Sequence, residues 1–123
     1  MQEEAKRYER DIKARSYSYA LNVIKLIDKM PKDNTSTVMG KQLLRSATSV
    51  GANIIEARAA SSRRDFTNFL NHALKSANES RFWLGLIRDS GKVVDVEIEP
   101  IFKETVEIGN ILGASVLRLK GRS

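Results

Sequence analysis

The stretch LLRSATSVGANIIEA, residues 43–57, decides the fold, because separate stripes of side chains run along it at helical spacing. At about 3.6 residues per turn, one side of this segment is a continuous apolar seam. The seam consists of Leu43, Ala47, Val50, Ile54 and Ala57. It predicts an amphipathic helix that packs on a hydrophobic core, with small residues that let a partner helix approach closely.

A polar stripe runs beside this seam with the same spacing. It consists of Gln42, Ser46, Ser49, Asn53 and Glu56. On a later segment, Ser76, Glu79 and Trp83 flank a second apolar seam in the same way. Because buried polar groups usually satisfy one another, we expect Asn53 or Glu56 to form a hydrogen bond with that later helix. The expected network consists of Gln42, Ser49, Asn53, Glu56, Ser76 and Glu79. Such a network would fix the register of the two helices; a ligand pocket made of the same residues is the alternative.

Two longer stretches carry a resemblance to a known family. QLLRSATSVGANIIEA at residues 42–57 and DFTNFLNHALKSANES at residues 65–80, with Trp83-Leu84 after them, resemble the four-helix-bundle proteins encoded in intervening sequences of bacterial 23S rRNA genes. The matching residues are Gln42, Arg45, Ser49, Asn53, Ile54, Glu56, Phe66, Phe69, Leu70, Ala73, Ser76, Glu79 and Leu84. The resemblance implies a homo-oligomer, with a pentamer as the favoured form, and no catalytic activity. It also implies a distant similarity to RNA-binding accessory proteins of diversity-generating retroelements.

Apolar periodicity predicts four helices, at about residues 4–30, 36–60, 64–90 and 96–120. The seam of the first helix consists of Tyr8, Ile12, Tyr19, Val23, Leu26, Ile27 and Met30. The seam of the third consists of Phe66, Phe69, Leu70, Ala73, Ala77, Leu84 and Ile87. The seam of the fourth consists of Ile98, Ile101, Thr105, Ile108, Leu112, Val116 and Leu119. The links are too short to cross a bundle, so the sequence predicts one all-α domain over residues 1–123, an antiparallel up-and-down four-helix bundle.

Local signals mark where these helices begin and end. Pro31 closes the first helix, and residues 34–36 offer three N-cap candidates for the second. Ser62, with Asp65 three residues later, resembles a capping box at the start of the third helix. Gly91 is the expected C-cap glycine at its end.

Several large apolar residues fall outside the seams. They are Tyr17, Leu21 and Ile24 in the first helix and Leu44 and Ile55 in the second. A single core cannot absorb this additional apolar surface, so we expect these five residues to form a subunit interface in a homo-oligomer.

The formal net charge of +6 is concentrated in one part of the sequence. Residues 34–64 hold five basic side chains and one acidic one, whereas residues 92–123 hold five of each. The basic residues of the first set are Lys41, Arg45, Arg58, Arg63 and Arg64. This surplus predicts binding of RNA or DNA through phosphate contacts, although composition alone favours an ordinary solvated basic surface. Arg45 lies close enough to the polar stripe to have a structural role, which would leave mainly the other three arginines.

The residue types present argue against an enzyme. The chain has no cysteine and one histidine, His72, so disulfides, thiolate metal sites and ordinary zinc sites are excluded. No Walker or Rossmann spacing, no Gly-x-Ser-x-Gly motif and no Glu-x-x-His pair is present. We therefore expect no catalytic residues, no metal and no cofactor. The charged start of the sequence and the lack of an apolar run of about 20 residues predict a cytoplasmic protein without a membrane segment.

Three classes of function remain open. The first is a nucleic-acid-binding accessory protein, whose affinity would depend on salt. The second is a structural homo-oligomer that recruits a protein partner. The third is a small-molecule-binding or enzymatic bundle, which would need a pocket with a bound ligand.

Overall fold

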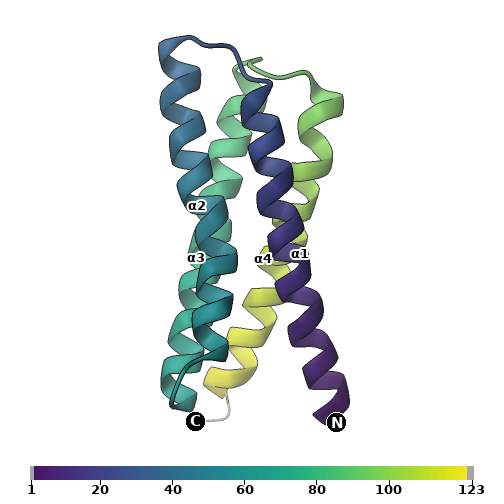
Figure 1. The fold of residues 1–123 in the computed structure, drawn as a ribbon, viewed down its shortest axis with the longest axis vertical. Coiled ribbons are helices and arrows are strands. Elements are labelled where there is room, and N and C mark those ends of the chain that lie inside the picture. Colours follow the sequence, from purple (N-terminus) through teal and green to yellow (C-terminus); the bar gives the residue numbers. More distant parts are fainter. Residues whose placement is uncertain (1, 122–123) are drawn as a thin grey trace.

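The computed structural model describes residues 2–121, with side chains from residue 11 onward. It contains the helices α1 (Gln2–Asp28), α2 (Asn34–Arg58), α3 (Arg63–Asp89) and α4 (Asp95–Gly121). The four helices lie alongside one another in one elongated bundle (Figure 1). Every expected helix boundary lies within two residues of the observed one.

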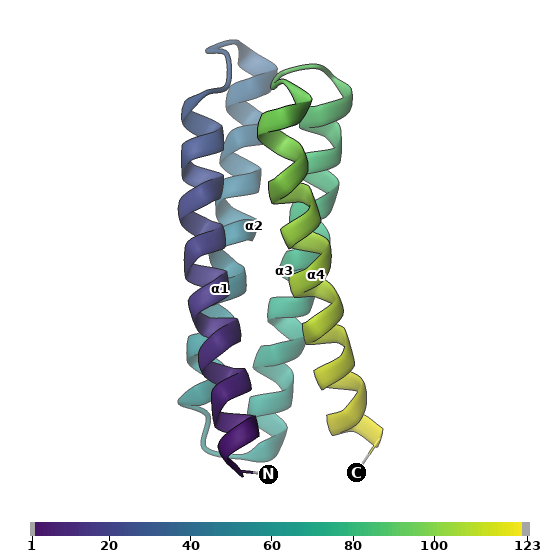
Figure 2. The same cartoon turned by 90° about the vertical axis from the view of Figure 1, so that its right-hand side faces the viewer.

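The helices alternate in direction. The α1–α2 and α3–α4 links lie at one end, here called the upper end, while the α2–α3 link and both chain termini lie at the lower end (Figures 1 and 2). Each helix packs against two neighbours, in the order α1, α2, α3, α4 around the bundle. The α2–α3 pair makes the most extensive contact and the α1–α4 pair the least. The prediction of an antiparallel up-and-down four-helix bundle is confirmed.

The predicted seams form the core. The seam of residues 43–57 is buried throughout, as are most seam residues of the other helices. The half-buried exceptions are Ile27, Phe66, Phe69, Ile101 and Leu119. Tyr8, also predicted for the core, lies outside the residues whose side chains are described.

The contact between α1 and α2 is close because glycines replace larger residues there. A Cβ atom on Gly51 would lie 3.2 Å from Ser16 Oγ, and one on Gly40 would lie 3.4 Å from Ile27 Cγ2. These two approaches also fix which residues of α1 and α2 lie at the same level of the bundle.

The N-cap prediction for α2 is wrong by one residue. Asp33, not residues 34–36, caps the helix, with its Oδ1 atom accepting a hydrogen bond from Ser36 N at 2.8 Å. This bond lowers the pKa of the Asp33 carboxyl group to about 2. Asp33 takes the role because its backbone is extended, which the N-cap position requires.

The other two end signals are found as expected. Ser62 Oγ accepts a hydrogen bond from Asp65 N at 3.0 Å at the start of α3. Gly91 has a φ of +72° and follows α3, and Lys92 N donates to Ile87 O at 3.2 Å across the turn. This is a Schellman-type ending, which needs a residue that tolerates positive φ.

In the part of the chain that the structure describes, no helix is both long and apolar enough to span a membrane.

Two glycine substitutions should change stability in opposite directions. Gly91→Ala forces a Cβ atom into the left-handed region and should lower the free energy of unfolding by about 1 kcal/mol. Gly85→Ala lies inside α3, where the new Cβ atom would meet Phe102 at an ordinary 4.0 Å, and should raise stability by up to about 1 kcal/mol. Urea unfolding followed by circular dichroism measures both. Changes of the same sign in the two variants would contradict this account.

Candidate nucleic-acid interface and its polar network

Four hydroxyl side chains, one from each helix, meet inside the core. Ser46 Oγ of α2 lies 2.8 Å from Ser80 Oγ of α3. Thr105 Oγ1 of α4 lies 2.7 Å from the phenol oxygen of Tyr19 of α1, and the Ser80 hydroxyl is close enough to this phenol to influence its pKa. All four residues are buried. We call these four residues the hydroxyl layer; one hydrogen bond joins α2 to α3, a second joins α1 to α4, and Tyr19 and Ser80 bring the two pairs together.

Backbone carbonyl groups complete the layer. Ser80 donates to Ser76 O and Thr105 to Ile101 O, each at 2.7 to 2.8 Å. Burial raises the pKa of Tyr19 to about 12, so the phenol is neutral at physiological pH. The sequence placed Tyr19 and Thr105 in the apolar seams and did not identify them as network members. The available signal was that both carry a hydroxyl group at a core position.

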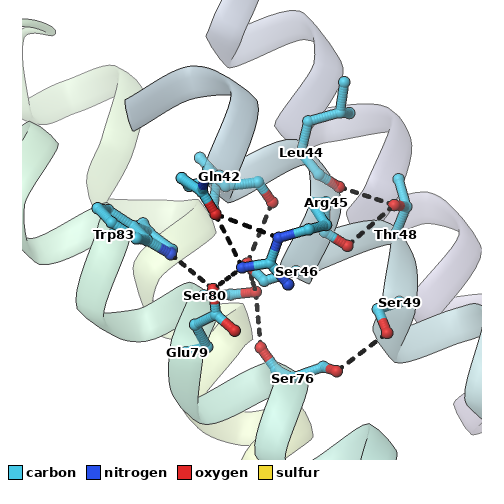
Figure 3. A network of polar contacts seen from close by, with 11 residues as sticks. Gln42, Leu44, Arg45, Ser46, Thr48, Ser49, Ser76, Glu79, Ser80 and Trp83 are labelled. Atoms are coloured by element: carbon cyan, nitrogen blue, oxygen red, sulfur yellow. Dashed lines mark hydrogen bonds and ion pairs between the residues drawn. The ribbon is translucent and has the colours of Figure 1, made fainter. Parts of the chain in front are cut away.

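A second set of polar contacts lies on the outside of the α2–α3 contact (Figure 3). Arg45 donates to Gln42 Oε1 at 2.9 Å and forms an ion pair with Glu79. Glu79 also accepts a hydrogen bond from Trp83 Nε1 at 2.9 Å. The bond from Trp83, together with Arg45, lowers the pKa of Glu79. The Arg45 side chain is 56% exposed, so water screens this pair and its role is to orient the side chains more than to stabilise the fold.

The expected direct bond from Asn53 or Glu56 to α3 is wrong. Asn53 donates to Ser49 O and Ser49 Oγ of its own helix, at 2.9 and 3.0 Å. Glu56 is exposed. Ser49 makes the connection to α3 instead, by accepting a hydrogen bond from Ser76 Oγ at 3.1 Å. A short amide side chain in a helix reaches the carbonyl group four residues earlier more easily than a neighbouring helix, which explains the difference.

The five predicted nucleic-acid-binding residues do not form one surface. Lys41 is exposed, but it lies 17 residues before Arg58 on the same helix, which is about 25 Å along the axis. Arg45 is engaged with Gln42 and Glu79. Only Arg58, Arg63 and Arg64 gather, around the α2–α3 link at the lower end.

The C-terminus of α4 adds two more basic residues to the lower end. Arg118 and Lys120 lie in the last turn of α4, and Arg63 of α3 donates to Leu119 O of that turn at 3.1 Å. Residues 52–69 and 115–121, which cover this end of α2, α3 and α4, hold five basic side chains and two acidic ones. The basic ones are Arg58, Arg63, Arg64, Arg118 and Lys120, which we call the basic end. None of the described residues forms an ion pair with Arg58, Arg64 or Arg118.

The upper end has a different charge balance. Residues 22–40 and 83–101 hold five basic and six acidic side chains. Several of them are paired across helices: Lys29 with Glu97 at 2.6 Å, Lys92 with Asp33 at 3.3 Å and Arg88 with Glu99 at 3.6 Å. Counted over α2, α3 and α4, the lower end is therefore basic, whereas the upper end is close to neutral.

Sequence reasoning missed Arg118 and Lys120 because it counted charge by segment. Residues 92–123 are neutral in total, but in α4 the acidic residues come early and Arg118 and Lys120 come last, as the helix dipole favours. Only the antiparallel fold brings the end of α4 beside the α2–α3 link.

The five residues expected at a subunit interface are all exposed, Tyr17 by as much as 68%. Between residues 14 and 24 of α1 and between residues 44 and 55 of α2, the only charged residues are Arg15 and Arg45. Arg15 pairs with Glu104 and Glu107 of α4, on the other side of α1. Within these two ranges the outer α1–α2 surface thus carries no charged side chain, while the exposed Thr48 and, just before the first range, Lys13 are polar.

His72 is exposed on α3. Within the described part of the chain, no three His, Asp or Glu side chains are grouped so that they could hold a metal ion.

The chain is similar to proteins of one family. The family model for the 23S rRNA-intervening sequence protein matches residues 9–114. A solved structure that it resembles is the crystal structure of a protein of unknown function from the S23 ribosomal protein family of Bacteroides thetaiotaomicron. The two share 38% sequence identity and a TM-score of 0.82, over 89% of this chain and 97% of that one. No curated protein matches significantly.

Tyr19→Phe should test the hydroxyl layer. The variant leaves buried hydroxyl groups without one partner and should lose about 1 to 2 kcal/mol of unfolding free energy at pH 7. The pKa of Tyr19 is about 12 in the folded protein and 10.0 unperturbed, so the folded state keeps the proton after the unfolded state has lost it. Wild-type stability should therefore fall relative to the variant by about 1.4 kcal/mol per pH unit between pH 10 and 12. Urea titrations over this range measure the difference. A difference that stays constant with pH would show that the phenol is not buried in this way.

Proposed function

The chain belongs to the 23S rRNA-intervening sequence protein family, and from this premise we propose that it is a non-enzymatic homo-oligomer that binds RNA through its basic end. The observation that carries the proposal is the charge asymmetry along the bundle. Arginine and lysine from three different helices gather at the lower end, while the upper end holds five basic and six acidic side chains and is close to neutral. The family name, which refers to 23S rRNA, makes RNA the first nucleic acid to test.

The arrangement suits phosphate contacts more than base recognition. The basic residues lie at helix ends and in a short link, so no helix or strand presents a row of side chains to a groove. A guanidinium group binds phosphate with two parallel hydrogen bonds, and three of the described arginines here have no acidic partner. We expect strong salt dependence and little sequence preference.

Oligomerisation would multiply this weak site. In a closed assembly, each copy contributes the same basic end, so the field grows with the number of subunits. Five is the number we expect, with a mass of five times 13.8 kDa in light scattering. A mass of 13.8 kDa at micromolar concentration would reject the oligomer.

The structure changes which residues should be tested. Lys41 lies far from the cluster, Arg45 is engaged with Glu79, and Arg63 supports the end of α4. The informative variant is therefore the triple change of Arg58, Arg64 and Arg118 to Glu. All three are exposed, so the fold should survive.

Binding of a labelled RNA hairpin, measured by fluorescence anisotropy over a salt series, tests the proposal. Wild-type affinity should fall with salt by a log–log slope of about 0.9 per phosphate neutralised on duplex and about 0.7 on single strands. The triple variant should bind much more weakly, and its slope should be smaller by about one for each phosphate that it no longer neutralises.

A matched control variant shows whether a loss of RNA affinity depends on where the charges are changed or only on the net charge of the protein. Changing Lys25, Lys32 and Lys103 to Glu removes the same charge from exposed positions elsewhere on the bundle. This control should keep most of the affinity. An equal loss in both variants would reject the basic end as the site. Salt-independent or absent binding by the wild type would reject RNA binding and favour the recruitment of a protein partner.

A further inference from the structure

A groove runs along the outer surface between α3 and α4. It has a volume of about 390 Å³ and extends along α4 from Thr105 down to Leu117, a length of about 18 Å at 1.5 Å per residue. Its small and polar lining residues are Ala77, Asn78, Arg81, Gly109, Asn110 and Gly113, and we call it the α3–α4 groove. The residues that line it include one basic side chain and no acidic one.

The glycines of the helices indicate that this surface is kept open. In the described chain, five glycines lie inside helices and away from their ends, and the close α1–α2 contact explains Gly40 and Gly51. At the other three, an added Cβ atom would meet its nearest neighbour only at ordinary distances, 4.0 Å at Gly85 and 3.9 Å at Gly109 and Gly113. Alanine would fit at these positions and is the better helix former. All three lie where α3 meets α4, and what glycine provides there is room for a molecule to approach the backbone from outside.

Three exposed polar side chains of the groove are not used by the fold. Among the described residues, the amide groups of Asn78 and Asn110 form no hydrogen bond, and Arg81 forms no ion pair. Arg81 is held instead over the ring of Phe102, with its guanidinium carbon 5.8 Å from the ring centroid. Asparagine is also a weak helix former, so helix stability does not explain either amide. The groove therefore offers hydrogen-bond donors, acceptors and one positive charge to a bound molecule.

We propose that the α3–α4 groove binds an unpaired stretch of the same RNA whose phosphates contact the basic end. The inference rests on the RNA binding in the proposed function and adds which part of the RNA lies where. The lower mouth of the groove is at Leu117, which directly precedes Arg118 of the basic end. A strand that leaves the basic end can therefore enter the groove without crossing a helix.

A nucleotide matches the groove in shape and chemistry. The flat face of a base can lie on the backbone at Gly109 and Gly113 or stack on the guanidinium plane of Arg81. The amides of Asn78 and Asn110 can pair with the edges of bases, which are free only where the RNA is unpaired. With no carboxylate in its lining, the groove does not repel the phosphates between these bases. The groove thus distinguishes single-stranded from double-stranded RNA.

A helix of a protein partner is a poorer occupant. Packing an apolar helix into the groove would bury the amides of Asn78 and Asn110 and the charge of Arg81 without partners, which is unfavourable. RNA carries donors, acceptors and negative charge along its whole length. It is also attracted by the five basic side chains of the adjoining basic end.

Hairpins that share one stem test this inference. One is blunt, and the other carries a single-stranded extension of a few nucleotides, placed in turn at the 3′ and at the 5′ end. The wild-type protein should bind one of the extended hairpins more tightly by about tenfold or more, the usual contribution of a base held by stacking. An extension that has the same phosphates but no bases should lose most of this gain. Fluorescence anisotropy at one salt concentration measures every affinity.

Two pairs of substitutions should remove the preference for the extension. Asn78→Asp with Asn110→Asp keeps the shape of both side chains but replaces amide donors by charges that repel phosphate. Gly109→Ala with Gly113→Ala raises the floor of the groove and should leave the melting temperature unchanged or higher, since alanine favours a helix. Both variants should bind the blunt and the extended hairpin with nearly equal affinity. A purely structural role of these glycines would not produce a protein that is as stable as wild type and has lost only this preference.

Asn22→Asp with Asn34→Asp is the matched control, because both asparagines are exposed and lie outside the groove. It changes the net charge by the same amount and should keep the wild-type preference. Circular dichroism shows whether each variant is folded, and the alanine pair decides if the aspartate pair is not.

The inference is overturned if the wild type binds blunt and extended hairpins equally, if the extension without bases gives the same gain, or if a folded groove variant keeps the preference. A protein segment would then be the better occupant of the groove. Absence of binding to every hairpin would instead reject RNA binding itself, so the two failures are distinguishable.

Discussion

A hydroxyl group buried in an apolar core is costly unless it is hydrogen-bonded, and this cost favours one register of the four helices. Among the described residues, Ser36 Oγ near the start of α2 is buried without such a bond. An unsatisfied buried group costs about 1 to 3 kcal/mol. In the hydroxyl layer, Ser46, Ser80, Tyr19 and Thr105 each come from a different helix. Moving any one helix by a turn, about 5.4 Å, would separate at least one of these groups from its partner. Apolar seams alone are less restrictive, because side chains of similar size recur along them.

The features on the surface depend on this register. Arg45 meets Glu79, and Ser49 meets Ser76, only because Ser46 and Ser80 hold α2 and α3 at one level. The same arrangement brings the α2–α3 link beside the last turn of α4, where Arg63 donates to Leu119 O. The position of the basic end thus depends on polar contacts inside the core.

The sequence predicts the fold more completely than it predicts the candidate site. The seam of residues 43–57 was sufficient for the fold, since periodicity determines which side of a helix is buried. Gly91 and Ser62 were recognisable because their roles depend on local backbone geometry. The hydrogen-bond partner of Asn53 could not be predicted in this way. Periodicity gives the direction of a side chain, but not how far it reaches or whether a carbonyl group of its own helix competes for it. Arg118 could be joined to Arg58 only once the topology placed the two helix ends together.

The two arginines in the first turn of α3 differ in whether the fold explains their presence. A helix N-terminus carries partial positive charge, so cations there are locally unfavourable. α3 nevertheless begins with Arg63 and Arg64, and only Asp65 opposes them in that turn. Arg63 has a structural reason, since it donates to Leu119 O at the negative end of α4. Arg64 has no such contact with any described residue and is exposed. The stability of the fold alone would not select an arginine at this position, whereas an anionic partner at the lower end would, and a helix N-terminus would itself attract the same phosphate groups.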